Sequence, residues 1–148
     1  MTDLQISTAE GAPLPTIRTV SDSPRVLVVE DDRDTREVVK LLLQMEGMQV
    51  SEASDGCEAL DQLHTMRHAD PQCPCVIVLD MMMPRCSGEE FRTRQLRDPR
   101  VADVPIIVLS AVADSRGVEV IQPFARLAKP FNADELVMLV RRACGMHD

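Results

Sequence analysis

Four short, mostly aliphatic runs of the 148-residue chain end in side chains that could take part in chemistry. In chain order, the polar residues that directly follow these runs are Glu30 and Asp31, then Asp80, Ser110 and Lys129. Carboxylates are hard oxygen ligands that suit Mg²⁺, and a carboxylate can itself attack phosphorus to give an aspartyl phosphate. A hydroxyl and an ammonium can stabilise the negative charge of a transferred phosphoryl group. Together, the five residues predict Mg²⁺-dependent phosphoryl transfer to a carboxylate.

Taken singly, each of these residues has an ordinary structural interpretation, as a helix cap, a turn or a solvated surface charge. Their joint interpretation depends on strands that bring the ends of the runs together. The runs with the composition of strands are residues 26–29, 49–53, 75–79, 106–109 and 125–128. Helical patterns separate them, and the strongest runs are apolar throughout, as is typical of strands covered on both faces. This alternation predicts an α/β fold with a doubly wound, five-stranded parallel sheet. Ligands bind at the carboxyl ends of such strands, so the polar residues are expected at one edge.

Helices between the runs are predicted from capping pairs and apolar spacing. The capping pairs are Asp34 with Glu37, Asp55 with Glu58, Ser87 with Glu90, and Asn132 with Glu135. Gly47 is expected to end the first helix. The apolar residues of that helix at the spacing i, i+3, i+4 and i+7 are Val38, Leu41, Leu42 and Met45. This spacing is typical of an amphipathic helix.

Composition limits the classes of function. The formal net charge of −8 argues against nonspecific binding to nucleic acid and to anionic membrane surfaces. The chain shows neither a run long enough to span a membrane nor a secretory signal, so a cytoplasmic location is expected. Residues 1–23 are rich in Pro, Ser and Thr and are expected to form a disordered or loosely attached tail. Residues 24–146 are expected to form one domain.

The chain has five cysteines, and in a reducing compartment most of them are expected to be free thiols. Those expected to act as small packing residues are Cys57, Cys86 and Cys144. A zinc site is an alternative for one cluster, which consists of His64, His68, Cys73 and Cys75. Its C-P-C spacing departs from the usual C-x-x-C, and we therefore favour an ordinary loop.

The motifs VLVVEDD, LDMMMPRCSG, IIVLSA and AKPF occur in an order that resembles the receiver domain of two-component response regulators. The resemblance covers about residues 24–145 and implies a flavodoxin-like fold. It implies that Asp80 accepts a phosphoryl group from a histidine kinase, a hybrid kinase or a phosphotransfer protein. It also implies that Mg²⁺ is held by Glu30, Asp31, Asp80 and the backbone carbonyl of Met82. Without metal, repulsion between these acids is expected to raise at least one pKa.

The same resemblance assigns the family's hydroxyl and lysine to Ser110 and Lys129 and implies a cis bond between Lys129 and Pro130. It places Asp32 outside the site, as a solvated residue of the loop before the first helix. Two departures stand out. Arg126 occupies the position of the family's aromatic switch residue, and the segment from Ser110 to Lys129 is short, which predicts a short or irregular fourth helix.

These features favour a stand-alone, phosphorylatable response regulator that signals by protein binding or by phosphorelay. It is expected to catalyse only its own phosphotransfer and slow self-dephosphorylation. One alternative is an interaction module with a receiver fold that acts without phosphorylation. Another is a phosphatase with an aspartyl nucleophile, which the residues after Asp80 disfavour because they are three methionines and offer no general acid.

Overall fold

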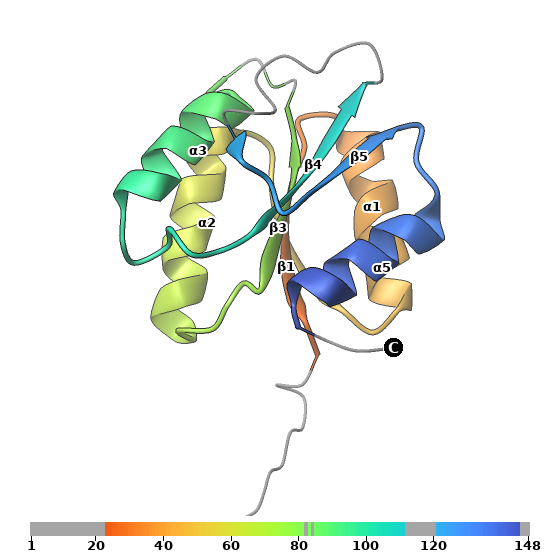
Figure 1. Ribbon diagram of the computed structural model, residues 1–148, viewed down its shortest axis with the longest axis horizontal. Helices are drawn as coiled ribbons and strands as arrows, with labels where there is room; N and C mark the ends of the chain where they lie inside the picture. Colours follow the sequence, from red (N-terminus) through yellow and green to blue (C-terminus); the bar gives the residue numbers. More distant parts are fainter. Residues whose placement is uncertain (1–22, 82, 84, 112–120, 146–148) are drawn as a thin grey trace, which may run out of the picture.

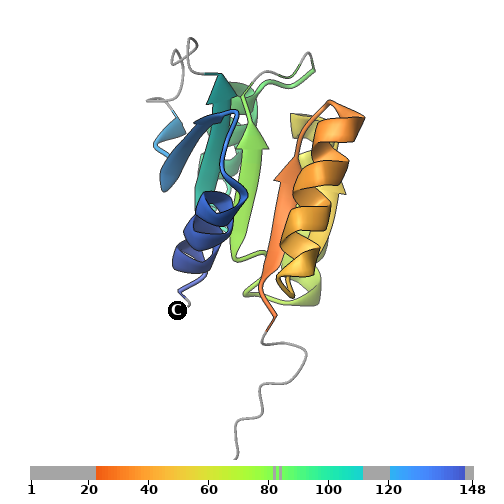
Figure 2. The same cartoon turned by 90° about the vertical axis from the view of Figure 1, so that its right-hand side faces the viewer.

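One parallel sheet forms the centre of the computed structural model, which describes residues 23–145 except 82, 84 and 112–120. The sheet order is β2-β1-β3-β4-β5. The strands are β1 (Arg25–Val29), β2 (Gln49–Ala53), β3 (Val76–Asp80), β4 (Ile106–Ala111) and β5 (Ala125–Lys129). The helices of the described residues are α1 (Arg33–Met45), α2 (Gly56–Ala69), α3 (Gly88–Arg97) and α5 (Ala133–Ala143). Helices α2 and α3 cover one face and α1 and α5 the other, so the predicted α/β fold is confirmed (Figures 1 and 2).

The core has two halves, one on each face of the sheet. Leu27 and Ile77 belong to the half beneath α2 and α3, whereas Val26 and Val28 belong to the half beneath α1 and α5. All five residues of β3 are buried, because this strand lies in the middle of the sheet and is covered on both sides. This burial explains why the third run is apolar up to Asp80.

Three of the four predicted helix caps are confirmed, and the first is wrong. Asp55, Ser87 and Asn132 each cap a helix and accept hydrogen bonds from backbone N–H groups of the first turn. Helix α1, however, begins at Arg33, and its cap is Asp32, which accepts from the N–H of Thr35. The predicted cap, Asp34, lies inside the first turn, where its charge still suits the positive end of the helix dipole.

The amphipathic helix predicted from this spacing is confirmed as α1, but the spacing does not identify its buried face. The fully buried residues of this helix are Val39 and Leu43, whereas Val38, Leu41 and Met45 are 54%, 48% and 80% exposed. Apolar residues occupy more than one face of α1, so spacing alone did not identify the face that packs on the sheet. As a result, an apolar stripe of Val38, Leu41 and Met45 is exposed to solvent. Gly47, with a φ of +84°, follows the helix and ends it as predicted.

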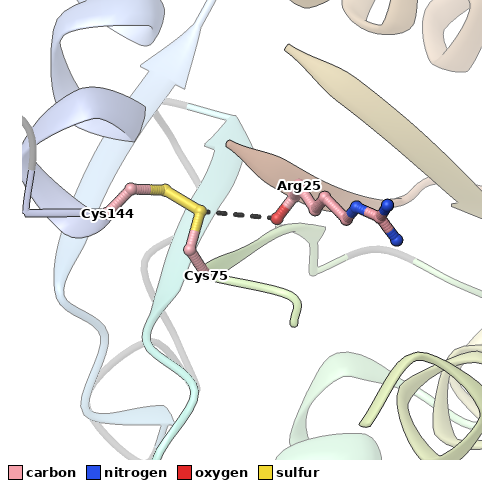
Figure 3. The surroundings of a disulfide bond; sticks show 3 residues. All are labelled: Arg25, Cys75 and Cys144. Atoms are coloured by element: carbon pink, nitrogen blue, oxygen red, sulfur yellow. Dashed lines mark hydrogen bonds between the residues drawn. A yellow bond between two sulfur atoms is a disulfide. The ribbon is translucent and has the colours of Figure 1, made fainter. Parts of the chain in front are cut away.

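A disulfide joins Cys75, directly before β3, to Cys144 at the C-terminal end of α5 (Figure 3). The expectation that Cys144 is a free packing residue is therefore wrong, because the fold brings two cysteines 69 positions apart to a Cα–Cα distance of 5.0 Å. The sulfur of Cys75 also lies 3.4 Å from the carbonyl oxygen of Arg25. Cys57, Cys73 and Cys86 are free, as expected.

The ordinary-loop interpretation of the histidine and cysteine cluster is consistent with this pairing. Cys75 is in the disulfide, and His64 lies 3.2 Å from a carboxylate oxygen of Asp98. Within the part of the chain that the structure describes, no group of histidines and cysteines is placed to hold a metal ion.

Two predictions concern residues outside the described part of the chain. The tail, predicted for residues 1–23, falls there except for its last residue, and the short fourth helix falls mostly on residues 112–120. No helix among the described residues is both long and apolar enough to cross a membrane.

Candidate functional site

The carboxyl ends of four strands place the predicted polar residues at one edge of the sheet. Glu30 directly follows β1, Asp80 ends β3, Ser110 is the fifth residue of β4, and Lys129 ends β5. The parallel register sets Asp80 beside Leu109 and Lys129 beside Ala111, so neighbouring strands end at similar heights. Because the strands are parallel and lie next to one another in the sheet, their carboxyl ends bring these side chains together.

Three acids form a group with the dimensions of a metal site. Carboxylate oxygens of Glu30, Asp31 and Asp80 all lie within 4.8 Å of one another. Glu30 and Asp80 are buried, whereas Asp31 is exposed at the mouth of the group. Three carboxylates open to solvent on one side suit Mg²⁺, which takes one or two carboxylates and keeps several waters. The fourth predicted ligand, the carbonyl of Met82, lies outside the described residues.

The backbone around Glu30 is held by β2 and α1. Its N–H donates to the carbonyl of Ala53 at 3.1 Å, and the Nη1 of Arg36 donates to the carbonyl of Glu30 at 2.8 Å. Arg36 is itself oriented by Glu52, with 3.2 Å between Nε and Oε1. Lys40 donates to the other oxygen of Glu52 at 3.0 Å. These contacts fix where the chain leaves β1 and hence where the acids lie.

Lys129 connects the two buried acids. Its Nζ lies 3.3 Å from Oδ1 of Asp80 and 3.4 Å from Oε1 of Glu30. Burial of the ammonium lowers the pKa of Lys129, but the negative charges of Asp80 and Glu30 outweigh it, so the pKa lies above its usual value. The lysine is therefore charged at neutral pH and supplies a positive charge beside the two acids.

The carboxyl group of Glu30 titrates abnormally. Burial, followed by a hydrogen bond with Asp80, raises the pKa of Glu30 to about 7. The backbone N–H of Asp32 and the charge of Lys129 act in the opposite direction. The predicted direction is confirmed, but loss of hydration by burial has a larger effect than repulsion between the acids. A cation bound here would favour the ionised form of Glu30.

Ser110 provides an independent test of whether the site fits a phosphoryl group and a metal. Its side chain is buried, and its Oγ has no hydrogen-bond partner among the described residues. Buried hydroxyls are nearly always paired, because an unpaired one costs about 1–3 kcal/mol. A hydroxyl without a partner, at the same edge as three acids and an ammonium, is suited to an oxygen atom that arrives with a ligand. The donor set therefore fits Mg²⁺ and a phosphoryl group.

Two further predicted positions have clear outcomes. Asp32 lies outside the acid group, as predicted, but it has a structural role as the cap of α1. Arg126 is exposed on β5, which is one of the two edge strands of the described sheet. The bond between Lys129 and Pro130 is cis, as the resemblance implied.

Sequence reasoning missed Arg92 and Gln95, which are buried on α3. Arg92 donates through Nε to the carbonyl of Ile121 at 2.8 Å and through Nη1 to Oε1 of Gln95 at 2.7 Å. Gln95 in turn donates to the carbonyls of Val101 and Val104. These bonds hold the chain shortly before β5, which carries Lys129. The only signal in the sequence was negative: apolar periodicity is weak after the start of α3, because polar residues occupy its buried positions.

Comparisons with known proteins agree with this geometry. The family model described as the response regulator receiver domain matches residues 26–141. Response regulator MprA of Mycobacterium tuberculosis (strain H37Rv) is 42% identical over 123 residues, which are 80% of this chain and 50% of MprA. The "DNA-binding dual master transcriptional regulator RpaA" of Synechocystis is 32% identical over 80% of this chain and 48% of its own. The chain thus spans about half the length of the curated relatives it matches.

Solved structures of receiver domains are also similar. The receiver domain of the sensor histidine kinase PA1611 of Pseudomonas aeruginosa, described with a magnesium ion coordinated in its active-site cleft, has a TM-score of 0.73 and 27% identity. The match covers 83% of this chain and 98% of that one. The chemotaxis response regulator CheY4 of Vibrio cholerae has a TM-score of 0.71 and 28% identity, with coverage of 82% and 98%.

Proposed function

Because the chain belongs to the family of response regulator receiver domains, we propose that Asp80 accepts a phosphoryl group from a histidine kinase or a phosphotransfer protein. The observation that best supports this proposal is the position of Lys129, whose Nζ lies 3.3 Å from Oδ1 of Asp80. Glu30 and Asp31 present oxygens within 4.8 Å of the same carboxylate. A nucleophile, a positive charge and a metal-binding group are thus assembled around one residue.

In the proposed reaction, a carboxylate oxygen of Asp80 attacks the phosphorus atom of a phosphohistidine. The bond between phosphorus and the histidine nitrogen breaks as the bond to Asp80 forms, and the product is an aspartyl phosphate. Lys129 and Ser110 stabilise the negative charge on the phosphoryl oxygens, one by its ammonium and one by its hydroxyl. Mg²⁺, held by Glu30, Asp31 and Asp80, would supply further positive charge next to these oxygens.

The proposal limits catalysis to the protein's own phosphorylation and slow self-dephosphorylation. In this proposal Asp80 is the nucleophile, and Glu30 and Asp31 are ligands of the metal and therefore ionised. This leaves no acid of the group for protonating a leaving group in multiple turnovers. We therefore propose a signalling protein and not a phosphatase.

The phosphodonor must bring its phosphohistidine to Asp80, and one surface beside the site suits a protein partner. A groove lies along α1, with Val38 and Leu42 on one side and Lys129, Pro130 and Phe131 on the other. Because Lys129 lies both in this groove and at the site, a partner bound there would be next to the phosphoacceptor. The exposed apolar stripe on α1 continues this surface. We propose that the phosphodonor protein docks here through an apolar surface of its own.

The output of this domain is proposed to be protein binding or onward transfer of the phosphoryl group. The whole chain has a net charge of −8, which is unfavourable for contact with nucleic-acid phosphates. RpaA is described as DNA-binding, but this chain matches only 48% of it. DNA binding is therefore not proposed for this domain.

A second candidate function is an interaction module that acts without phosphorylation. The exposed Arg126, at the position where the family carries an aromatic switch residue, favours it. The group around Asp80 favours phosphorylation more strongly. A site that is not phosphorylated would have no function for an ammonium 3.3 Å from its carboxylate.

Phosphorylation can be tested with acetyl phosphate and Mg²⁺, followed by intact mass measurement. We expect one phosphoryl adduct on the wild-type protein and none on Asp80→Asn, which keeps the size of the side chain. Beryllofluoride with Mg²⁺ should raise the unfolding temperature of the wild type only, because it binds the folded state. An adduct of equal amount on Asp80→Asn would contradict the proposal. Partner affinity that is unchanged by beryllofluoride would favour the second candidate.

A further inference from the structure

Two of the free cysteines meet where the loop after β3 touches the start of α2. Asp55, Gly56 and Cys57 are the cap and first two residues of α2, and Arg85 and Cys86 belong to the loop between β3 and α3. The Nη2 of Arg85 lies 3.7 Å from Oδ2 of Asp55. The N–H of Gly56 donates to the carbonyl of Cys86 at 3.1 Å. Cys57 directly follows Gly56, so this contact brings the two cysteines close together.

The loop after β3 packs tightly against the first turn of α2. A β-carbon on Gly56 would lie 2.4 Å from the carbonyl oxygen of Cys86 and 2.8 Å from its sulfur, so a glycine is required there. Cys86 has a φ of +49°, which is uncommon for a residue with a side chain. Helices α2 and α3 lie side by side on the same face of the sheet (Figure 1). The contact therefore joins the start of one helix to the loop that leads into its neighbour.

Both thiols are partly exposed and can be reached by a small molecule. Burial and the hydrogen bond with Cys57 raise the pKa of Cys86 to about 12. Cys73, the remaining free cysteine, is buried in the loop before β3. Cys86 lies in the loop after that strand, so Cys73 is not expected to compete for it.

We propose that Cys57 and Cys86 are a redox modification site at which hydrogen peroxide closes a second disulfide. In the first step, the sulfur of one of the two cysteines takes one oxygen atom from the peroxide, giving a sulfenic acid and one water. In the second step, the sulfur of the other cysteine attacks the sulfur of the sulfenic acid, the S–O bond breaks, and the hydroxyl leaves as water with the thiol proton. Two thiols lose two electrons and two protons, and one peroxide is reduced to two waters.

The new bond would tether the loop that leaves Asp80 to the first turn of α2. This loop connects the proposed phosphoacceptor to α3, so its position bears on access to the site. The modification itself does not depend on phosphorylation, since neither thiol is a ligand or a reacting group of the site described above.

The test uses the full chain with its Cys75–Cys144 disulfide intact. Protein is treated with increasing hydrogen peroxide, blocked with an alkylating reagent and mapped by mass spectrometry without reduction. We expect the number of free thiols to fall from three to one, with peptides of Cys57 and Cys86 linked within one chain. A reductant should restore the two thiols.

Cys57→Ser and Cys86→Ser should each abolish the link, whereas the control Cys73→Ser should keep it. Asp80→Asn should also keep the link, so that failure of this proposal is distinct from failure of phosphorylation. The proposal is overturned if wild-type Cys57 and Cys86 oxidise separately to sulfinic acids, or if they link to Cys73 or to another chain. Because the wild type alone gives the decisive map, the outcome does not depend on the variants folding.

Discussion

The Nζ of Lys129 lies 3.3 Å from Asp80, although the two residues end strands that are not neighbours in the sheet. Strand β4 lies between them, and the lysine side chain reaches across its carboxyl end to the acids. The same ammonium lies 3.4 Å from Glu30. One lysine thereby balances the charge of two buried carboxyl groups, and this balance determines how the site responds to pH, to metal and to mutation.

Stability without metal should fall as pH rises. The folded-state pKa of Glu30 is about 7, above its ordinary value of 4.5, so the folded chain binds the proton more tightly than the unfolded chain. The resulting stabilisation is fully present below pH 4.5 and is lost as pH rises through 7. We expect the free energy of unfolding, measured by urea denaturation in EDTA, to decrease between pH 5 and pH 7.5. Glu30→Gln should flatten this dependence, and the exposed control Glu89→Gln should not. An equally steep profile in Glu30→Gln would assign the effect to another group.

Removal of the Ser110 hydroxyl should stabilise the ligand-free fold and weaken ligand binding. The Oγ is buried without a partner among the described residues, so Ser110→Ala should raise the free energy of unfolding by about 1 kcal/mol in the absence of ligand. The same variant should bind beryllofluoride on the order of tenfold more weakly, because a hydrogen bond to a charged group is lost. Ser110→Thr keeps a hydroxyl and serves as the control. Unchanged beryllofluoride affinity in Ser110→Ala would remove Ser110 from the proposed site.

The neighbours Asp31 and Asp32 should give opposite phenotypes. Asp31 belongs to the acid group, so Asp31→Ala should weaken Mg²⁺ binding by a factor on the order of ten and leave stability nearly unchanged. Asp32 caps α1, so Asp32→Ala should cost about 1 kcal/mol of stability and have little effect on Mg²⁺ binding. Asp32→Ser, which can still cap, should restore most of the stability. Titration calorimetry and urea denaturation measure the two effects. Equal losses of Mg²⁺ affinity would mean that the acids are assigned in the wrong register.

The disulfide between Cys75 and Cys144 should stabilise the chain. It closes a long loop, because the two cysteines are 69 positions apart in the chain, and so restricts the unfolded state. Its loss should lower the free energy of unfolding by about 2–4 kcal/mol. Cys144→Ser should show this loss without reductant, and the wild type should show it only with reductant. If reductant destabilises Cys144→Ser by the same amount, the effect does not come from this bond.

The exposed apolar stripe on α1 should affect the rate of phosphoryl transfer from a protein donor and not from a small-molecule donor. Leu41→Lys places a charge in the proposed docking surface, and Leu96→Lys makes the matched change on α3, where Leu96 is similarly exposed. We expect Leu41→Lys to slow phosphoryl transfer from a histidine kinase at least tenfold, since a charge is unfavourable in an apolar contact. Its labelling by acetyl phosphate should match the wild type. Equal transfer rates in the two variants would exclude docking at α1.

Much of the site could be predicted from the sequence because its residues follow apolar runs. Glu30, Asp80, Ser110 and Lys129 each stand at or next to a strand end, and parallel strands bring such ends together. Continuous apolar character marked the buried strands, and the caps at Asp55, Ser87 and Asn132 were visible as short local motifs. These features depend on residues close together in the chain.

Other features were decided by the tertiary structure, because they depend on residues far apart in the chain. Apolar spacing on α1 offered two possible core faces, and packing against the sheet buried the one with Val39 and Leu43. Neither the disulfide nor the contact of Cys57 with Cys86 has a sequence motif, since both arise from elements that meet only in the fold. The sequence by itself thus determined the residue types of the site and their common edge. The tertiary structure determined their distances, the raised pKa of Glu30 and the pairing of the cysteines, because burial and charge act through space.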